Sequence, residues 1–333
     1  DADGTAFVGI HLGVRRTSLA VADALGHVLA MRSLGAYRSE ADRALRELPD
    51  IVVAVAGEAG VPRARIGAIG VAVPGLVDAV TASCVLAPNL GWREVPLGPR
   101  LTDAFGVPVA VRNSMQAGGT AEVRLGGHRA ATSFAWVYVE DGIGAAVVAD
   151  GRVLYGKHGY AGEIGHWRRG EEGSACACGR RGCLETVASG AAIEAAAKAA
   201  LSGGAQAGAT PPALDAQDVA EAARSGDPAA QRVLARAAEH LGVAVSNSID
   251  LLDPDRVVLD GPVVRASDFF VEAVRATVAR RAINAPTVPI VRSVVGGDVM
   301  LKGAVLLAMD AIGAAPYPEQ ERPSTGDWLS RGP

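Results

Sequence analysis

The segment from residue 158 to residue 185 constrains the fold of this chain more than any other. It reads His158-Gly-Tyr-Ala-Gly-Glu-Ile-Gly-His166 and, further on, Cys176-Ala-Cys178-Gly-Arg-Arg-Gly-Cys183-Leu-Glu185. Three of the four cysteines lie here, whereas Cys84 stands alone in an apolar segment. One imidazole and three thiols within such a short span can form a tetrahedral zinc site. A closed zinc site can contribute on the order of 10 kcal/mol toward ordering a loop.

A disulfide and chance remain the alternatives to a metal. A bridge between Cys176 and Cys178 would close a very tight loop, and pairing either with Cys183 would leave an odd thiol. We expect no signal peptide and a reducing, cytoplasmic location, where thiols beside a histidine are more often metal ligands than bridges. The expected zinc ligands are therefore His166, Cys176, Cys178 and Cys183. Four protein ligands leave no open position, so the zinc would be structural and would order the surroundings of Glu163 and Glu185.

Composition limits the class of protein. The chain has 333 residues, of which 49% are hydrophobic and 20% charged. It can bury a large aliphatic core, which we expect to be divided between two domains. No apolar run approaches the length of a membrane span, and a formal net charge of −4 gives no electrostatic footprint for nucleic acid. We expect a soluble protein that binds no membrane and does not contact DNA through these residues.

The residue pattern predicts an α/β protein. Short β-prone runs at 6–12, 17–22 and 28–33 predict a three-stranded meander. A helical pattern at 39–59 and an apolar strand at 66–73 follow, which suggests a mixed sheet with a crossover helix. Further strands are expected at 107–111, 134–139, 145–149, 152–155 and 256–259, with a hairpin turn at Asp150-Gly151. Further helices are expected at 113–125, 191–201, 216–224, 228–252, 266–281 and 300–312.

A β-hairpin with a glycine-containing turn opens each half of the chain, which suggests two related α/β domains facing a cleft. We expect a small N-terminal domain at 1–112, with the helix at 300–312 packing back on it. A larger domain at 113–299 would carry the zinc-binding loop. The segment 202–212 is rich in Gly, Ala and Pro and is expected to be a linker, and 313–333 is expected to be a flexible tail.

These motifs resemble the ROK family, which comprises sugar kinases, sugar-responsive transcriptional repressors and their relatives. The resemblance rests on Gly162-Glu-Ile-Gly-His166 and on the Cys-x-Cys-Gly-x-x-Gly-Cys-x-Glu motif that ends at Glu185, with weaker agreement from about Phe7 to Met309. Supporting matches are Val73-Pro-Gly-Leu-Val-Asp78, Ala87-Pro-Asn-Leu-Gly-Trp92 and Gly106-Val-Pro-Val-Ala-Val-Arg-Asn113. The resemblance implies the actin-like ATPase (ribonuclease H-like) fold, an α/β fold of two domains facing an interdomain cleft.

The resemblance also implies a sugar site. Asn89 and Asn113 match asparagines that hydrogen-bond sugar hydroxyls, and Glu163 and Glu185 match acidic acceptors. His166 matches a residue that serves both zinc and sugar. Amides and carboxylates supply directed donors and acceptors for hydroxyl groups. The alternative, that the two glutamates are solvated loop carboxylates, stays open.

The residue after Asn113 departs from the family's kinases. Their catalytic aspartate, which takes the proton from the sugar hydroxyl, would follow this asparagine directly, but the chain has Ser114. A serine hydroxyl cannot accept that proton near neutral pH, and loss of a general base costs roughly 10²–10⁴ in rate. We expect no catalytic residue. Ser114 is counted with the ligand-binding residues, since loss of a carboxylate could let a phosphorylated sugar fit.

The nucleotide side departs from the kinase pattern as well. His11 stands where the first phosphate loop has an aspartate, and magnesium does not favour imidazole. Asp141-Gly142-Ile-Gly144 replaces Gly-Thr-Gly in the second loop, where a carboxylate would repel a triphosphate. Asp260-Gly261-Pro262 replaces a glycine pair near the adenosine pocket. His11 could instead be a strand-end residue and Asp141 a turn residue. Together the changes favour a sugar-binding pseudokinase.

The leading hypothesis is the effector-binding and oligomerisation part of a ROK transcriptional regulator, without enzymatic activity. Such regulators carry an N-terminal winged helix-turn-helix, so we expect a DNA-binding domain of roughly 60–90 residues upstream of Asp1. Operator DNA would be a partner only through that domain, and a sugar or sugar derivative would be the ligand. The alternatives are an ATP-dependent kinase of hexoses or N-acetylhexosamines and a freestanding sugar sensor. The resemblance favours a homodimer or homotetramer.

Overall fold

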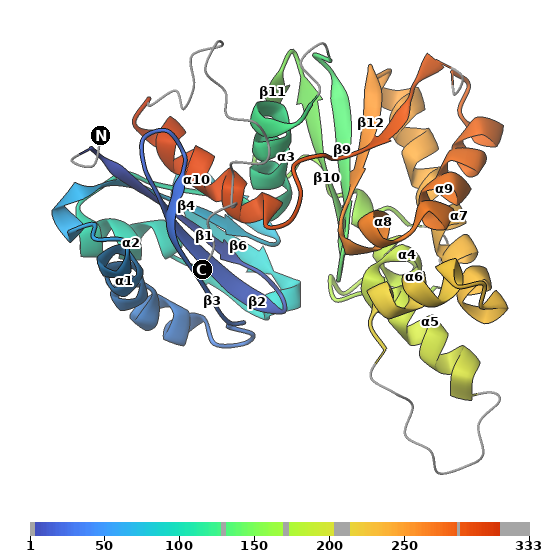
Figure 1. The fold of residues 1–333 in the computed structure, drawn as a ribbon, viewed down its shortest axis with the longest axis horizontal. Helices are drawn as coiled ribbons and strands as arrows, with labels where there is room; N and C mark the ends of the chain where they lie inside the picture. The colour runs from blue at the N-terminus through green and yellow to red at the C-terminus, as the bar shows by residue number, and fades with distance from the viewer. Residues whose placement is uncertain (1–3, 128–130, 169–172, 203–213, 285–286, 314–333) are drawn as a thin grey trace. The chain divides into compact units, whose positions relative to one another are not determined.

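The computed structural model describes residues 4–127, 131–168, 173–202, 214–284 and 287–313. The chain forms two compact α/β units (Figure 1). The first is built from residues up to 128, from 152–161 and from 294 onward, and the second from 129–151 and 162–293. Each unit therefore combines segments that are distant in sequence.

The sheet of the first unit has the order β3-β2-β1-β4-β8. The meander β1–β2–β3 is antiparallel, whereas β4 and β8 join it in parallel. Alternation along the central strands divides their side chains between two faces. The strands are β1 (Ala6–Leu12), β2 (Arg16–Ala22), β3 (Val28–Gly35), β4 (Ile66–Val73) and β8 (Val109–Asn113).

Helices cover the two faces of this sheet at different distances. On one face, Val8 and Ile10 of β1 share an aliphatic core with Leu48 and Val52 of α1 (Ala41–Glu58). On the other, α10 (Val299–Ala311) lies almost against the strand backbones, because β1 and β4 place Gly9 and Gly70 beneath it. A methyl group built on Gly70 would lie 1.9 Å from the carbonyl oxygen of Ala304.

The rest of the first unit surrounds the sheet edge at β8. A small antiparallel sheet has the order β5-β6-β7. Asn113 ends β8 and caps α3, since its side-chain oxygen accepts a hydrogen bond from the backbone N–H of Met115. The elements are η1 (Arg63–Arg65), β5 (Leu76–Asp78), β6 (Ser83–Ala87), η2 (Pro88–Leu90), β7 (Trp92–Val95), α2 (Leu97–Phe105) and α3 (Ser114–Leu125).

A mixed sheet with the order β11-β10-β9-β12-β13 contributes four strands, β10, β9, β12 and β13, to the second unit, whereas residues 152–161, which include the edge strand β11, are grouped with the first unit. The chain leaves this unit at β11 (Arg152–Val153), the edge strand that follows the Asp150-Gly151 turn. The remaining strands are β9 (Phe134–Val139), β10 (Ile143–Ala149), β12 (Arg256–Asp260) and β13 (Ile290–Arg292). β9, β12 and β13 run parallel, so their carboxyl ends meet at one edge.

Helices bury one face of the second sheet. Val137 and Leu259 share a core with Leu241 and Phe270 from the long helices α7 and α9. The elements are η3 (Ile164–His166), α4 (Glu185–Ala188), α5 (Gly190–Ser202), α6 (Ala216–Arg224), α7 (Pro228–Leu252), α8 (Pro262–Ala266) and α9 (Asp268–Arg281). Among the helices of the described ranges, none combines the length and hydropathy that a membrane span requires.

Most of the expected elements are present with small shifts. The expected helix at 266–281 is divided, because the Ser267 hydroxyl accepts from the N–H of Phe270 and starts α9 there. The strand expected at 107–111 begins at Val109, and the strand expected at 152–155 has two residues. The sheet β5–β7, the helix α2 and the strand β13 were not expected. The segments 203–212 and 314–333, expected to be linker and tail, lie outside the described residues.

The division between the units differs from the expected boundary at residue 112. α3 packs with α10 in the first unit rather than with the second sheet. Gly303 of α10 permits this contact, since a methyl group built there would lie 1.9 Å from the carbonyl oxygen of Ala117 in α3. The helix pair therefore extends the first unit to residue 128.

Gly303→Ala is expected to destabilise the protein, because the added methyl group would collide with the backbone of Ala117. Overpacking of this kind costs about 1–3 kcal/mol, which should lower the midpoint of urea unfolding followed by circular dichroism. The matched control is Gly57→Ala in α1, where nothing lies within 4 Å of the new methyl group. The control should keep or raise stability. Equal midpoints for the two variants would contradict the close packing of α10 on α3.

Candidate metal centre and ligand site

The backbone of the His166 motif lies directly on strand β10. A methyl group on Gly162 would lie 2.0 Å from the carbonyl oxygen of Ala145, and one on Gly165 would lie 2.1 Å from that of Ile143. Gly162 also has φ +96°, a conformation that other residues rarely adopt. The two glycines let the segment approach the strand, and η3 then presents His166 at its end.

The cysteine segment folds back onto the same place through backbone hydrogen bonds. The N–H of Leu184 donates to the carbonyl oxygen of Trp167 at 2.9 Å, which brings Cys183 beside His166. Within the segment, the N–H of Cys176 donates to Arg180 at 2.8 Å and that of Gly179 donates to Cys176 at 2.9 Å. These bonds form a tight turn, and the thiols of Cys176 and Cys178 both lie on the side of this turn that faces His166. Ile164 and Leu184 anchor the whole arrangement in the hydrophobic core.

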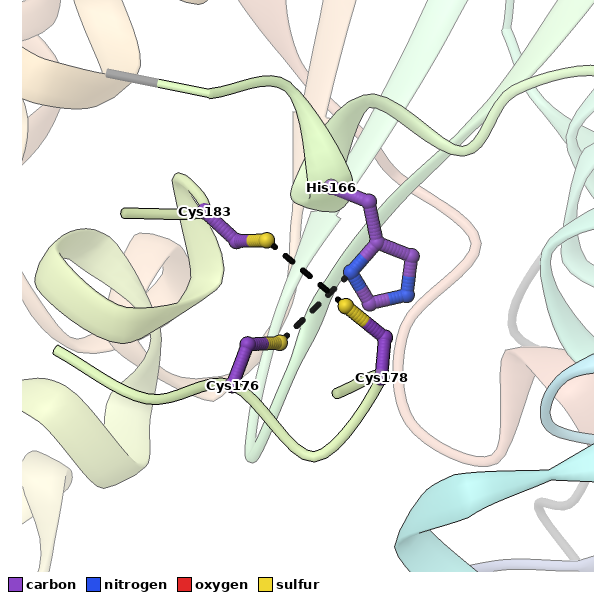
Figure 2. A group of neighbouring side chains, drawn as sticks. All are labelled: His166, Cys176, Cys178 and Cys183. Carbon is purple, nitrogen blue, oxygen red and sulfur yellow. Dashed lines mark hydrogen bonds between the residues drawn. The ribbon is translucent and has the colours of Figure 1, made fainter. Parts of the chain in front are cut away.

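The four expected metal ligands converge, as Figure 2 shows. Their ligand atoms all lie within 4.8 Å of one another. The Sγ atoms of Cys178 and Cys183 are 3.7 Å apart, and Nδ1 of His166 is 3.7 Å from Sγ of Cys176. All four cysteines of the chain are free thiols, so the disulfide alternative does not hold. This cluster can hold a single metal ion.

Protonation in the cluster suits metal binding. Burial lowers the pKa of His166, which favours the neutral ring that a metal requires. Burial raises the pKa of Cys178, but hydrogen bonds from Arg180 and the neighbouring thiols bring it down to about 7. Burial raises the pKa of Cys176 to about 12, so Cys178 loses its proton more readily. This role of Arg180 was not predicted from the sequence, although Arg180 lies between Cys178 and Cys183, where it could have been recognised.

Glu163 faces the second nitrogen of the same imidazole. Its carboxylate lies 3.7 Å from Nε2 of His166, opposite the nitrogen that faces the thiols. Burial, with a smaller contribution from the charge of Glu185, raises the pKa of Glu163 to about 7. Glu163 is thus a partly buried carboxylate beside the cluster, which disfavours its alternative interpretation as a solvated loop residue.

The carboxylate of Glu185 also lies beside the cluster and makes contacts within the fold. Oε2 accepts a hydrogen bond from the backbone N–H of Ile143 at 3.3 Å. Oε1 lies 3.9 Å from Sγ of Cys176. Glu163, His166 and Glu185 are therefore brought together in the second unit.

The first unit holds the other three expected ligand residues. Asn89 lies in η2 and is partly exposed. Asn113 is 6% exposed, and besides capping α3 it donates from Nδ2 to the carbonyl oxygen of Gly75 at 2.6 Å. Ser114 begins α3, and its Oγ is buried without a hydrogen-bond partner among the described residues. Asn113 thus has a structural task, whereas the Ser114 hydroxyl has none.

At the expected first phosphate loop, His11 is the penultimate residue of β1 and pairs with Ser18. Burial lowers its pKa to about 4, and the charge of Arg16 acts in the same direction. The guanidinium of Arg16 in turn binds the carboxylate of Asp298 at 2.7 Å, just before α10. This loop therefore carries the neutral imidazole of His11 and the ion pair between Arg16 and Asp298.

The other substituted positions lie in the second unit. Asp141 is in the short loop between β9 and β10, which joins the paired residues Val139 and Ile143. Asp260 ends β12, is 1% exposed and forms an ion pair with Arg265 of α8. Burial raises the pKa of Asp260, while the charge of Arg265 lowers it. Arg265 follows Asp260 by five residues, and nothing in the sequence pattern indicated that they pair.

Comparison with known proteins shows the family to which the chain belongs. Residues 7–311 match the model of the ROK family. The chain belongs to the ROK family. It is 27% identical over 291 residues to the xylose repressor of Caldicellulosiruptor bescii. The aligned region covers 85% of this chain and 72% of the repressor.

Solved structures of ROK proteins share the fold. A ROK family transcriptional regulator, described as a homolog of the Escherichia coli MLC protein, has a TM-score of 0.81 at 27% identity and covers 95% of this chain and 80% of its own. A ROK glucokinase from Streptomyces griseus in complex with glucose and AMPPNP has a TM-score of 0.79 at 25% identity. This match covers 92% of the present chain and 99% of the glucokinase chain. The expected actin-like ATPase fold is confirmed. The family contains both repressors and kinases.

Cys178→Ser is expected to abolish metal binding, because it removes one of four converging ligands. The purified wild type should contain about one equivalent of metal by inductively coupled plasma mass spectrometry, and the variant far less, with a lower unfolding temperature. Cys84→Ala is the matched control, since Cys84 is a buried free thiol of the other unit. Equal metal content in wild type and Cys178→Ser would contradict a metal site here.

Proposed function

We propose that this chain is the sugar-binding, effector-sensing part of a ROK transcriptional regulator and that it does not phosphorylate its ligand. The observation that carries this proposal is Ser114, a buried hydroxyl without a hydrogen-bond partner among the described residues, at the position where the resemblance places the general base of the family's kinases. The sugar-facing pair Glu163 and His166 is present beside the metal cluster. In this proposal the residues that recognise the sugar are retained, whereas the ability to phosphorylate it is lost.

The proposed metal is a structural zinc ion. A tetrahedral zinc with its usual bond lengths separates two sulfurs by about 3.8 Å and a nitrogen from a sulfur by about 3.6 Å. The separation of the Cys178 and Cys183 sulfurs and that of His166 Nδ1 from the Cys176 sulfur, both 3.7 Å, fit this geometry. Zinc would fix His166 through Nδ1 and leave the proton on Nε2, which then points to Glu163. With no position left for water, the ion would have no catalytic task.

The proposed ligand is a hexose, an N-acetylhexosamine or a derivative of one. Glu163 would accept a hydrogen bond from a sugar hydroxyl, and Nε2 of His166 would donate one. A partly buried carboxylate rejects ligands that leave it unpaired, which gives such a site its selectivity. The roles of Asn89, Asn113 and Ser114 as ligand contacts stay predictions. Glu185, already bonded to Ile143, would contribute its remaining acceptor capacity.

Several features support a non-enzymatic protein. His11 offers a neutral imidazole where magnesium would need a carboxylate. Asp141 puts a carboxylate in the β9–β10 loop, and the Asp260–Arg265 ion pair replaces a small glycine. In this proposal the chain is a pseudokinase that acts as a homodimer or homotetramer. Operator DNA would be bound by a segment outside the ROK match.

The second candidate is an ATP-dependent sugar kinase, which the likeness to the S. griseus glucokinase favours. A kinase would need a base other than Ser114 and a magnesium ligand other than His11. The two functions differ in turnover rather than in sugar binding, so they can be separated experimentally.

Isothermal titration calorimetry against a panel of hexoses and N-acetylhexosamines should find at least one ligand. At a pH well above the pKa of about 7 of Glu163, Glu163→Gln should weaken the affinity for this ligand about tenfold or more, because a hydrogen bond to a charged group is worth about 1.5–3 kcal/mol. Glu272→Gln is the matched control, since that carboxylate is exposed on α9, where it forms an ion pair with Arg275. A panel that gives no heat with any sugar, or a Glu163→Gln variant with full affinity, would count against the proposed site.

Coupled-enzyme detection of ADP should find no sugar-dependent turnover with magnesium-ATP. Because the base, the magnesium ligand and the phosphate loop are all altered, Ser114→Asp alone should also remain far below the usual kinase range of about 1–100 s⁻¹. The S. griseus type of enzyme serves as the positive control. Turnover in the kinase range by the wild type would establish the second candidate instead.

A further inference from the structure

The carboxylate of Glu185 reaches two separate parts of the second unit. Glu185 begins α4, two residues after the metal-ligand candidate Cys183. Its Oε1 lies 3.9 Å from Sγ of Cys176 in the cluster. Its Oε2 accepts from the N–H of Ile143, the first residue of β10. One side chain therefore spans the distance from the cluster to the β9–β10 hairpin.

The peptide of Ile143 is held from both sides by the metal-binding segments. While its N–H is bonded to Glu185, its carbonyl oxygen lies against Gly165, the residue before His166. A methyl group on Gly165 would be only 2.1 Å from that oxygen. The two arms of this clamp come from opposite ends of the cluster, one from the histidine side and one from the last cysteine.

The loop of the hairpin is held by a further backbone hydrogen bond. The N–H of Gly190, just beyond α4, donates to the carbonyl oxygen of Glu140 at 2.6 Å. Glu140 itself closes the loop by donating its N–H to Gly142 at 3.0 Å. The loop Glu140-Asp141-Gly142 thus contacts the segment that follows the last cysteine of the cluster.

We propose that Glu185 is a positioning residue that couples the metal cluster to the β9–β10 hairpin. A bound metal fixes His166 relative to Cys183, and this holds Gly165 and Glu185 at the spacing that clamps Ile143. Without the metal the two arms keep the backbone hydrogen bond between Leu184 and Trp167 but lose the link through the four ligands, and the hairpin loses part of its support. The inference rests on the metal assignment of the proposed function but not on sugar binding. It gives Glu185 a task besides contact with a ligand.

Hydrogen exchange followed by mass spectrometry tests the coupling in the complete chain. In the wild type, removal of the metal with a chelator should speed exchange of the amides at 140–144 by about tenfold or more. Strand β12, in the middle of the same sheet, should change little and reports general unfolding. If exchange at 140–144 is the same with and without the metal, the inference is wrong. If metal analysis finds no bound metal in the wild type, the metal assignment itself fails.

Two variants separate Glu185 from the rest of the clamp. Glu185→Ala, loaded with metal, should exchange fast at 140–144, and metal removal should add little. Glu185→Gln retains a carbonyl oxygen for the N–H of Ile143, so it should behave like the wild type. Slow exchange in the loaded Glu185→Ala protein would overturn the inference. So would exchange that rises equally in β12, since that result indicates general destabilisation rather than local coupling.

Discussion

The contact between β10 and the segment Gly162–His166 is the constraint on which the site depends. Two glycines, three residues apart, bring this segment against the carbonyl oxygens of Ala145 and Ile143. Because the contact is made by backbone on both sides, it leaves no room for side chains and fixes where His166 emerges. The three thiols then reach the imidazole through a returning segment tied by ordinary backbone hydrogen bonds. The position of the cluster is therefore set by strand β10 of the sheet.

The two units use small residues for the same physical purpose. In the first, Gly9, Gly70 and Gly303 let α10 lie against the strands and against α3. In the second, Gly242 lets α7 cross α9 beside Thr277. Close approach of backbones increases the number of dispersion contacts but leaves almost no tolerance for a larger residue. Such contacts hold the scaffold, while the side chains of the site lie at loops and strand ends.

Two of the positions expected on the nucleotide side lie beside or within ion pairs. Arg16 binds Asp298 near His11, and Arg265 binds Asp260 at the end of β12. A buried carboxylate without a partner is costly, so the pairing with Arg265 helps to explain how Asp260 is accommodated. Ser114 differs, because its buried hydroxyl has no partner among the described residues. The ion pairs Arg16–Asp298 and Arg265–Asp260 give the segments around His11 and Asp260 a structural role in the folded protein.

Much of this protein could be predicted from its sequence. The β-prone runs of the meander, the helical residue patterns and the spacing of His166, Cys176, Cys178 and Cys183 are local patterns, and their physics acts over a few residues. The tertiary structure decided what local patterns cannot encode. It assigned α3 to the first unit through Gly303, paired Asp260 with Arg265, and turned the carboxylate of Glu185 toward Ile143. Each of these depends on which segments pack together, because a hydrogen bond or close contact between distant residues forms only once the chain has folded.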